Sequence, residues 1–441
     1  MIARITLFAV AVSGWGLLTT VASAQESSRY AASQTGFVNC DAGHVDADVG
    51  TCTDPGCEQI GCETGADVSC DGIGRWNQWL GLGRLGRKHH PHCRCPLCCP
   101  RPTWASFEAL MWWGEGRSVP PLVTGGPDGV LPDAGVLFGD GDVGTGMAPG
   151  ARTNFGVWFD QCETLGMGAK FWGLDGDGTS FSADSDDQPL MFRPFHELTN
   201  FTDMENAFSV SRADRTGRLS ITTTSSVLGC EAYLRTSMLA GRGYDVDLLG
   251  GYSFMRLDDD INIFSVSDII SGPFTGSRVE LLDLFDARNE FHGGEVGLTS
   301  EVRYDCWTLT GLAKFSVGNM HQVVTIDGYD RRTTVGGSVT TQGAILALPT
   351  NIGTYARDRT VWIPEVGISA AYKVRDWLRL TVGYSGVWIS DVVFSGDQID
   401  QVVNPTQFTG GLLDGPARPA FTFRSTDYWL HGLNLGATLT Y

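Results

Sequence analysis

Seven side chains that could bind a soft metal ion lie within eleven residues near the N-terminus. They are His89, His90, His92, Cys93, Cys95, Cys98 and Cys99. Thiolates and imidazoles at such short spacing are ligands that Zn²⁺ prefers, so one interpretation is a metal site. A disulfide-stapled, loop-rich segment is the favoured interpretation, because the chain carries an export signal and exported cysteines are oxidised. The third interpretation is a tether without fixed structure.

A second set of residues has acid and base groups that could perform hydrolysis. It consists of Asp258, Asp259, Asp260, Asp397, Asp400, His292, His321 and His431. No nucleophile–base spacing can be recognised among them, and acidic loops are commonly only solvated. We therefore expect that the protein is not an enzyme, with an outer-membrane hydrolase as an alternative function.

Acidic turns offer oxygen ligands for Ca²⁺ at Asp140–Asp142, Asp175–Gly178 and Asp184–Asp187. None of them completes an EF-hand loop, and acidic glycine-rich turns also form for conformational reasons. We expect no cofactor.

The first 24 residues are typical of a secretory signal peptide. Arg4 supplies the positive charge, an apolar stretch runs from Ile5 to Ala22, and small residues precede the predicted cleavage between Ala24 and Gln25. An uncleaved membrane anchor is the alternative. The predicted organisation is a signal peptide at 1–24, a Cys-rich periplasmic segment at 25–103 and a β-rich domain at 104–441.

Composition excludes two classes of protein. The 441 residues carry 31 basic and 50 acidic side chains, a formal net charge of −19, which argues against binding of nucleic acid. Only 18% of the residues are charged and 57 are glycine, whereas typical domains have about 25% charged residues. After the N-terminus no apolar stretch is long enough for a transmembrane helix, so a helical membrane protein is excluded.

From Trp104 to Tyr441 apolar and polar residues alternate with a period of two. This period predicts strands with one apolar and one polar face, and their length suits strands that cross a bilayer. Ten strands are predicted, at 104–113, 152–160, 163–174, 217–235, 242–257, 288–304, 306–326, 358–373, 376–390 and 427–441. The predicted fold is an all-β, antiparallel transmembrane β-barrel.

The connections between these strands alternate in length. Four are short turns, and five run to about 30–42 residues, which is the arrangement of outer-membrane barrels with short turns in the periplasm and long extracellular loops. A hairpin around 259–267 joining the wall would give twelve strands. The even number of strands places both ends of the barrel on the periplasmic side.

Aromatic residues gather at the strand ends, as two interfacial girdles would require. The short-turn side has Trp104, Phe159, Tyr244, Tyr304, Trp307, Tyr372, Trp377 and Tyr441, and the long-loop side has Trp112, Trp113, Phe171, Phe254, Trp362, Trp388 and Trp429. The chain ends with a polar residue, a glycine, an apolar residue and an aromatic residue at Asn434, Gly436, Leu439 and Tyr441. This ending resembles the signal that the bacterial barrel-assembly machinery recognises, so we expect the cell outer membrane.

Several spaced motifs support a family resemblance over residues 104–441. They include Met111-Trp-Trp-Gly, Leu248-Leu-Gly-Gly-Tyr252, Arg288-Asn-Glu-Phe-His-Gly-Gly294, Leu348-Pro-Thr-Asn-Ile-Gly353, Pro364-Glu-Val-Gly367, Gly396-Asp-Gln-Ile-Asp400, Val403-Asn-Pro-Thr-Gln407 and the run from Arg418 to Trp429. The chain resembles the bacterial putative beta-barrel porin family 7, found in planctomycetes. The resemblance implies an outer-membrane β-barrel of undefined substrate and offers no catalytic residues.

Charged residues on the polar strand faces should point into the lumen. The principal ones are Glu108, Lys170, Glu295, Glu301, Lys314, Glu365 and Arg379. Buried charges must pair, and a barrel of eight strands is just wide enough for its side chains to fill it. We therefore expect a filled lumen and a structural or surface-recognition role, with a narrow or gated porin-like channel for small solutes as the alternative and a general-diffusion porin as a weaker one.

Three further cysteines, Cys162, Cys230 and Cys306, should lie at the short-turn end of the barrel. We expect at least one disulfide between them and Cys93, Cys95, Cys98 or Cys99. The expected partners are outer-membrane lipid and the assembly machinery, together with an extracellular ligand that the sequence does not identify, and no nucleic acid.

Overall fold

The computed structural model describes residues 103–441 apart from 161–162, 177, 242, 410–411 and 441. The predicted cleavage site at Ala24 and Gln25 lies outside the described residues, as do the cysteines up to Cys99. Cys162 and Tyr441 also lie outside them. No helix in the described part of the chain is long and apolar enough to cross a membrane.

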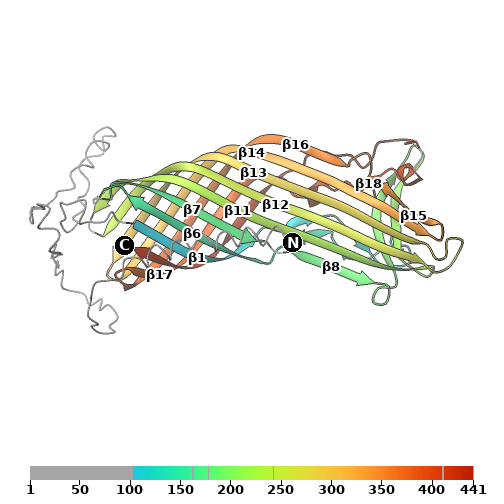
Figure 1. Cartoon of the computed structure of the whole chain (residues 1–441), viewed down its shortest axis with the longest axis horizontal. Helices are drawn as coiled ribbons and strands as arrows, with labels where there is room; N and C mark the ends of the chain where they lie inside the picture. Colours follow the sequence, from blue (N-terminus) through green and yellow to red (C-terminus); the bar gives the residue numbers. More distant parts are fainter. Residues whose placement is uncertain (1–102, 161–162, 177, 242, 410–411, 441) are drawn as a thin grey trace, which may run out of the picture. The chain divides into compact units, whose positions relative to one another are not determined.

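Ten antiparallel strands close into a ring within the described residues (Figure 1). In ring order they are β1 (Thr103–Gly114), β6 (Met147–Trp158), β7 (Leu165–Asp175), β11 (Arg215–Gly241), β12 (Tyr244–Ile269), β13 (Arg278–Tyr304), β14 (Trp307–Thr334), β16 (Gly353–Arg375), β17 (Leu378–Val392) and β19 (Thr426–Thr440). The ring closes where β19 pairs with β1, in the register Trp104↔Thr440. The predicted all-β, antiparallel barrel is therefore confirmed.

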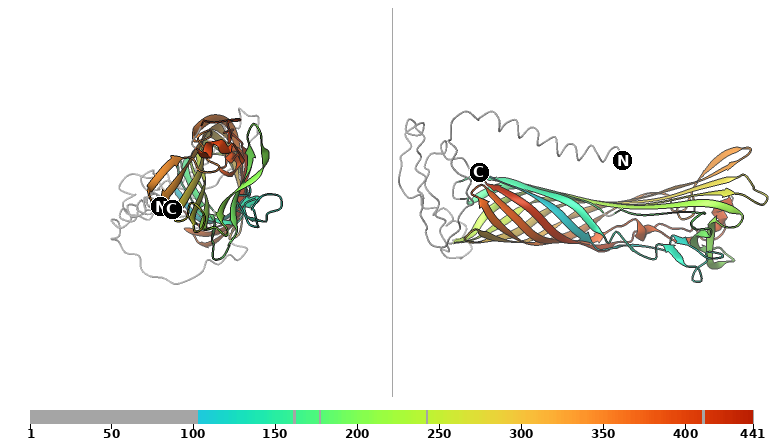
Figure 2. Two further views of the ribbon diagram at one scale, coloured as in Figure 1. Left: turned by 90° about the vertical axis from the view of Figure 1, so that its right-hand side faces the viewer. Right: turned by 90° about the horizontal axis from the view of Figure 1, so that it is seen from below.

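The strands β11 to β14 are far longer than a membrane requires. They contain 26 to 28 residues, which at about 3.3 Å per residue corresponds to roughly 90 Å. Figure 2 shows these strands continuing past the ring on one side. Two short strands extend this wall, because β8 (Thr179–Asp184) pairs with β11 and β15 (Gly337–Gln342) pairs with β14.

The prediction of a long loop is wrong for two of the five connections. Only residues 270–277 separate β12 from β13, and 335–352 separate β14 from β16. The strands continue because their inward residues remain apolar beyond the ends of the shorter ring strands: Ile261, Ile263 and Phe285 are buried in a core. The hairpin around 259–267 is part of β12 and adds no strand to the ring.

Apart from β8, which belongs to the wall, the three other long connections, 115–146, 176–214 and 393–425, form a structure that we call the cap. A five-stranded sheet contains β3 (Val123–Thr124), β4 (Val136–Phe138), β9 (Met191–Leu198), β10 (Asp203–Ser211) and β18 (Val402–Val403). A two-stranded ribbon pairs β2 (Arg117–Val119) with β5 (Gly141–Val143), and two 3₁₀ turns follow at η2 (Gly396–Gln398) and η3 (Pro405–Thr409). The cap packs against the inner face of the extended wall, since both contribute to one apolar core.

The outward face of the ring is an apolar band with aromatic residues at both edges. Exposed residues of the band include Val296, Leu298, Phe315, Val366, Ile368, Leu380, Val382, Leu433 and Leu435. Exposed aromatic rings lie near the short turns (Tyr244, Tyr304, Trp307, Tyr372, Trp377) and at the opposite edge (Tyr252, Trp362, Trp429). An apolar band with aromatic edges is typical of the outer surface of outer-membrane barrels.

Two tryptophans assigned to the girdles point inward instead. Trp112 is only 1% exposed, and Trp104 lies 5.3 Å from Trp158 between ring centroids. Both have even numbers on β1 and therefore share the face of the buried Leu110. Whether a residue number is odd or even along a strand decides which face its side chain lies on. These two tryptophans therefore point inward although they lie near the ends of β1.

Candidate functional site

Successive layers of side chains lie inside the ring, and the first of them is ionic. Lys314 Nζ lies 2.6 Å from Glu231, 2.6 Å from Glu365 and 3.3 Å from Glu295. Lys170 Nζ lies 2.9 Å from Glu231 and 3.0 Å from Glu365. These five side chains are each less than 10% exposed and come from five strands of the ring. Three carboxylates and two ammonium groups thus form one buried network.

A second ionic cluster lies nearer the short turns. Arg235 Nε donates to Asp247 at 2.7 Å, and its Nη2 donates to Glu301 at 3.1 Å. Arg303 contacts Asp245 at 2.6 Å and Glu301 at 3.0 Å. The guanidinium carbon of Arg235 lies 5.0 Å from the ring centroid of Trp158, so an aromatic face also covers this charge.

The other predicted lumen charges lie on inward faces as well. Glu108 pairs with Arg152 on the neighbouring strand. Arg379 is half-buried on β17, on the face opposite the exposed Leu380, and no ion pair is found for it in the described part of the chain. The inward charges that sequence analysis named are thus brought together in pairs, except Arg379.

An apolar layer lies beyond the ionic network. Its buried members include Leu110, Trp112, Trp172, Met255, Phe291, Met320, Val361, Ile363, Val387 and Leu430. Buried apolar side chains from all ten strands of the ring meet in this layer. The small hollow beside Gly114, Ala148 and Tyr428 measures about 20 Å³, which is room for about one water molecule.

A third layer is a chain segment held inside the mouth of the ring. Asp259 of β12 accepts hydrogen bonds from Ser395 N at 2.8 Å and Ser395 Oγ at 2.5 Å, and it pairs with Arg117 of β2. Asn289 of β13 donates Nδ2 to Val393 O and accepts from Val393 N, both at 2.9 Å. Inward polar side chains of neighbouring strands thus hold residues 391–398, which we call the plug segment.

A second buried ion pair joins the cap to the wall. Arg193 of β9 donates to Asp283 Oδ2 of β13 at 2.5 Å, and both residues are 1% exposed or less. Asp283 Oδ1 accepts three backbone N–H groups, from Ile345, Leu346 and Ala347, at 3.2, 2.9 and 2.6 Å. One carboxylate therefore fixes both a cap strand and the connection after β15.

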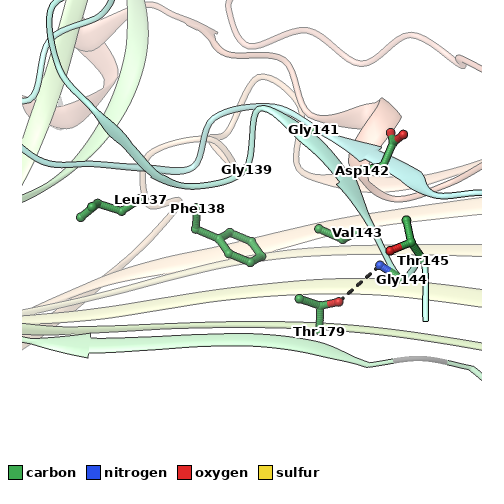
Figure 3. Close-up of a pocket in the computed structure, with 9 residues that line it drawn as sticks. All are labelled: Leu137, Phe138, Gly139, Gly141, Asp142, Val143, Gly144, Thr145 and Thr179. Atoms are coloured by element: carbon green, nitrogen blue, oxygen red, sulfur yellow. Dashed lines mark hydrogen bonds between the residues drawn. The ribbon is translucent and has the colours of Figure 1, made fainter. Parts of the chain in front are cut away.

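A hollow with an open mouth lies on the cap (Figure 3). It has a volume of about 400 Å³, within the usual range for small ligands. Phe138 and Val143 line it together with Thr179, whose Oγ1 accepts a hydrogen bond from Gly144 N at 3.3 Å (Figure 3). Its lining combines one aromatic ring, hydroxyl groups and glycine backbone.

None of the three candidate histidines pairs with a candidate aspartate in the described residues, although Asp397 lies near Asp259. His292 Nδ1 lies 2.6 Å from Tyr252 Oη, and His431 Nδ1 lies 2.6 Å from Tyr384 Oη, each pair on the outward face. His321 bonds to Asp358 on another strand pair. Within the described residues, no group of three or more His, Cys, Asp or Glu side chains is arranged to hold a metal ion.

The cysteines near the barrel differ in state. Cys306 is disulfide-bonded and lies in the short turn between β13 and β14. Cys230, which was expected among the disulfide cysteines, is a free thiol. It has an even number on β11, where Leu228 and Leu234 are exposed outward, so it lies on the outer face of the band.

In the described part of the C-terminal motif, side chains alternate between the inward and outward faces as on the other strands. Asn434 is 3% exposed and points inward, whereas Leu433 and Leu435 are exposed. Gly436 lies where a Cβ would meet Phe107 O at 2.5 Å, so glycine permits close pairing with β1. The sequence did not predict the partners of Asn434, which are Trp112 and Ser385.

A family model described as "Putative beta barrel porin-7 (BBP7)" matches residues 104–441. Among solved structures, the outer membrane protease OmpT from Escherichia coli is 11% identical, with a TM-score of 0.36, over 78% of this chain and 97% of that one. A Pseudomonas aeruginosa FadL homologue is 11% identical, with a TM-score of 0.19, over 77% and 90%. No curated protein matches the sequence.

Proposed function

The chain belongs to the Putative beta barrel porin-7 family of outer-membrane β-barrels, and from this premise we propose that it is a closed barrel that displays its cap for recognition outside the cell. In this proposal the short turns, the N-terminal segment and the C-terminus are periplasmic. The barrel contacts outer-membrane lipid and is inserted by the barrel-assembly machinery. It has no enzymatic activity.

The observation that carries this proposal is the layered filling of the lumen. An open pore needs a continuous polar path, but here the apolar layer around Trp112 and Phe291 separates the ionic network from the plug segment. Ten strands leave little room beyond the side chains themselves. A wall that extends far past the apolar band, with a folded cap on it, provides a large surface for a recognition role.

Conductance in a planar bilayer tests the closed lumen. We expect little or no steady current from the refolded protein at neutral pH. The double variant Trp112→Ala with Phe291→Ala removes two rings from the apolar layer and should raise the conductance, whereas Leu433→Ala with Leu435→Ala on the outward face should not. A stable nanosiemens-scale current from the unmodified protein would instead establish the porin-like channel.

A further inference from the structure

Two loops of the cap meet at one point. The β9–β10 hairpin turns at residues 199–202, and Asn200 Nδ2 donates a 2.9 Å hydrogen bond to Asp414 Oδ1. A Cβ on Gly415 would lie only 3.1 Å from Asn200 N, so the backbones also approach closely. Residues more than 200 positions apart in the chain therefore form one continuous surface.

Four large apolar side chains around this junction are exposed. Phe201 is 88% exposed, Leu412 95%, Met204 53% and Leu413 43%. The turn holds Phe201 outward, since Thr199 Oγ1 accepts the N–H groups of Phe201 and Thr202 at 3.1 and 2.9 Å. Grouped apolar side chains that the fold keeps in water are typical of a surface that binds a partner.

The surroundings of these four residues are acidic. Glu197, Asp203, Glu205 and Asp414 lie on the same hairpin and loop. The nearby basic groups are engaged: Arg418 contacts Asp400 at 2.8 Å, and His196 lies between Asp203 and Glu205. An apolar centre with a negative rim complements a partner that is apolar and positively charged.

We propose that Phe201, Met204, Leu412 and Leu413 are the docking surface for a cationic, amphipathic peptide segment of an extracellular protein. This inference rests on the proposed function, because it requires the cap to lie outside the cell. The acidic rim opposes two other occupants. It would repel an anionic lipid surface, and a second copy of this chain would bring two negative rims together.

Peptide binding to the full chain in nanodiscs of zwitterionic lipid tests the proposal. The probes are a fluorescent 18-residue helix of leucine and lysine and a matched helix of leucine and glutamate. We expect the lysine helix to bind and the glutamate helix not to bind. Phe201→Ser with Leu412→Ser should weaken binding of the lysine helix by about tenfold or more, as loss of central apolar anchors does.

One further variant serves as a control, and another tests the acidic rim. Phe274→Ser with Val335→Ser removes exposed apolar residues at other tips of the wall and should leave the dissociation constant unchanged. Asp203→Asn with Glu205→Gln should weaken binding about threefold and reduce its dependence on salt. Equal binding of both helices, or equal binding by the Phe201/Leu412 variant and the unmodified chain, would overturn the docking surface. That result leaves a non-conducting barrel intact, whereas a nanosiemens current would refute the proposed function itself.

Discussion

Nε1 of Trp112 donates a 2.7 Å hydrogen bond to Oδ1 of Asn434 inside the lumen, and this bond joins the first strand of the ring to the last. Asn434 Nδ2 in turn donates to Ser385 Oγ of β17 at 2.6 Å. The three residues therefore link β1, β19 and β17 across the seam where the ring closes. The seam thus pairs the two strands that lie at opposite ends of the domain's sequence.

Asn434→Leu should destabilise the refolded barrel by about 1–3 kcal/mol, because the buried indole N–H of Trp112 loses its acceptor. Urea unfolding in detergent, followed by tryptophan fluorescence, measures the loss. Asn319→Leu is the matched control: Asn319 also donates to a side chain, Asp358, but the bond is exposed. The seam would be unimportant if both variants lost the same small amount.

Lys314→Met should cost more, about 3–5 kcal/mol, since it leaves Glu231, Glu295 and Glu365 with a single ammonium partner in the lumen. Glu295→Gln should be much milder, because Glu295 contacts Lys314 only at 3.3 Å and its removal lowers the excess of negative charge. Chemical unfolding of both proteins decides the order. A larger loss for Glu295→Gln would contradict the charge count of this network.

Asp283→Ala should loosen the cap without opening the ring. The carboxylate is the shared acceptor for Arg193 and for the backbone of residues 345–347, so its loss leaves both without a partner. Limited proteolysis should then cut within 343–352 at least tenfold faster, while the protein remains heat-modifiable on gels. Asp330→Ala, which removes an exposed pair with Arg332, is the control and should not change the cleavage rate.

The strands and inward charges were predictable because they depend on local alternation. Lys170, Lys314 and Glu365 lie on polar strand faces, and parity alone assigns those faces to the lumen. The extension of β12 was not predictable in this way, because Asp258, Asp259 and Asp260 interrupt the apolar pattern as a loop would. In the fold Asp259 faces inward from β12. Its charge is balanced by Arg117, which is 142 residues away in the sequence and lies in the connection after β1.

The cap was missed for the same reason. Its strands are short, and β3 and β18 contain only two residues each, so they carry no period of their own. They form because the extended wall offers a buried apolar face on which they pack. Such a tertiary contact leaves no signature in the sequence of either segment.

The stability of the plug segment should depend on pH through Asp397. Burial and the neighbouring Asp259 raise the pKa of Asp397 to about 6 from its ordinary value of 3.8, against the opposing charge of Arg424. A folded pKa above the unfolded one means that this contribution to stability is present below about pH 4 and is lost as the pH rises to about 6. Arg117, which pairs with Asp259, and Tyr428 also face this region.

Asp397→Asn should therefore flatten the pH dependence and raise the melting temperature at pH 8, by about 2–4 °C for each kcal/mol recovered. Melting curves at pH 4, 6 and 8 measure the effect. Asp414→Asn, in an exposed part of the cap, is the control for a general loss of negative charge. If the melting temperatures of the unmodified and Asp397→Asn proteins changed with pH in parallel, ionisation of this carboxyl would not affect the stability of the fold.

The position and orientation of the barrel in the membrane can be tested by cysteine labelling. Cys230 lies on the outer face of the apolar band, so in intact cells a lipid-soluble maleimide should label it and a membrane-impermeant maleimide should not. In a Cys230→Ser background, Ser338→Cys at the exposed edge of β15 should react with the impermeant reagent in intact cells, because the proposed orientation places the cap outside. Asp305→Cys in the short turn after β13 should react only after the outer membrane is permeabilised. Labelling of the turn but not of β15 in intact cells would reverse the orientation, and with it the docking surface around Phe201 would face the periplasm.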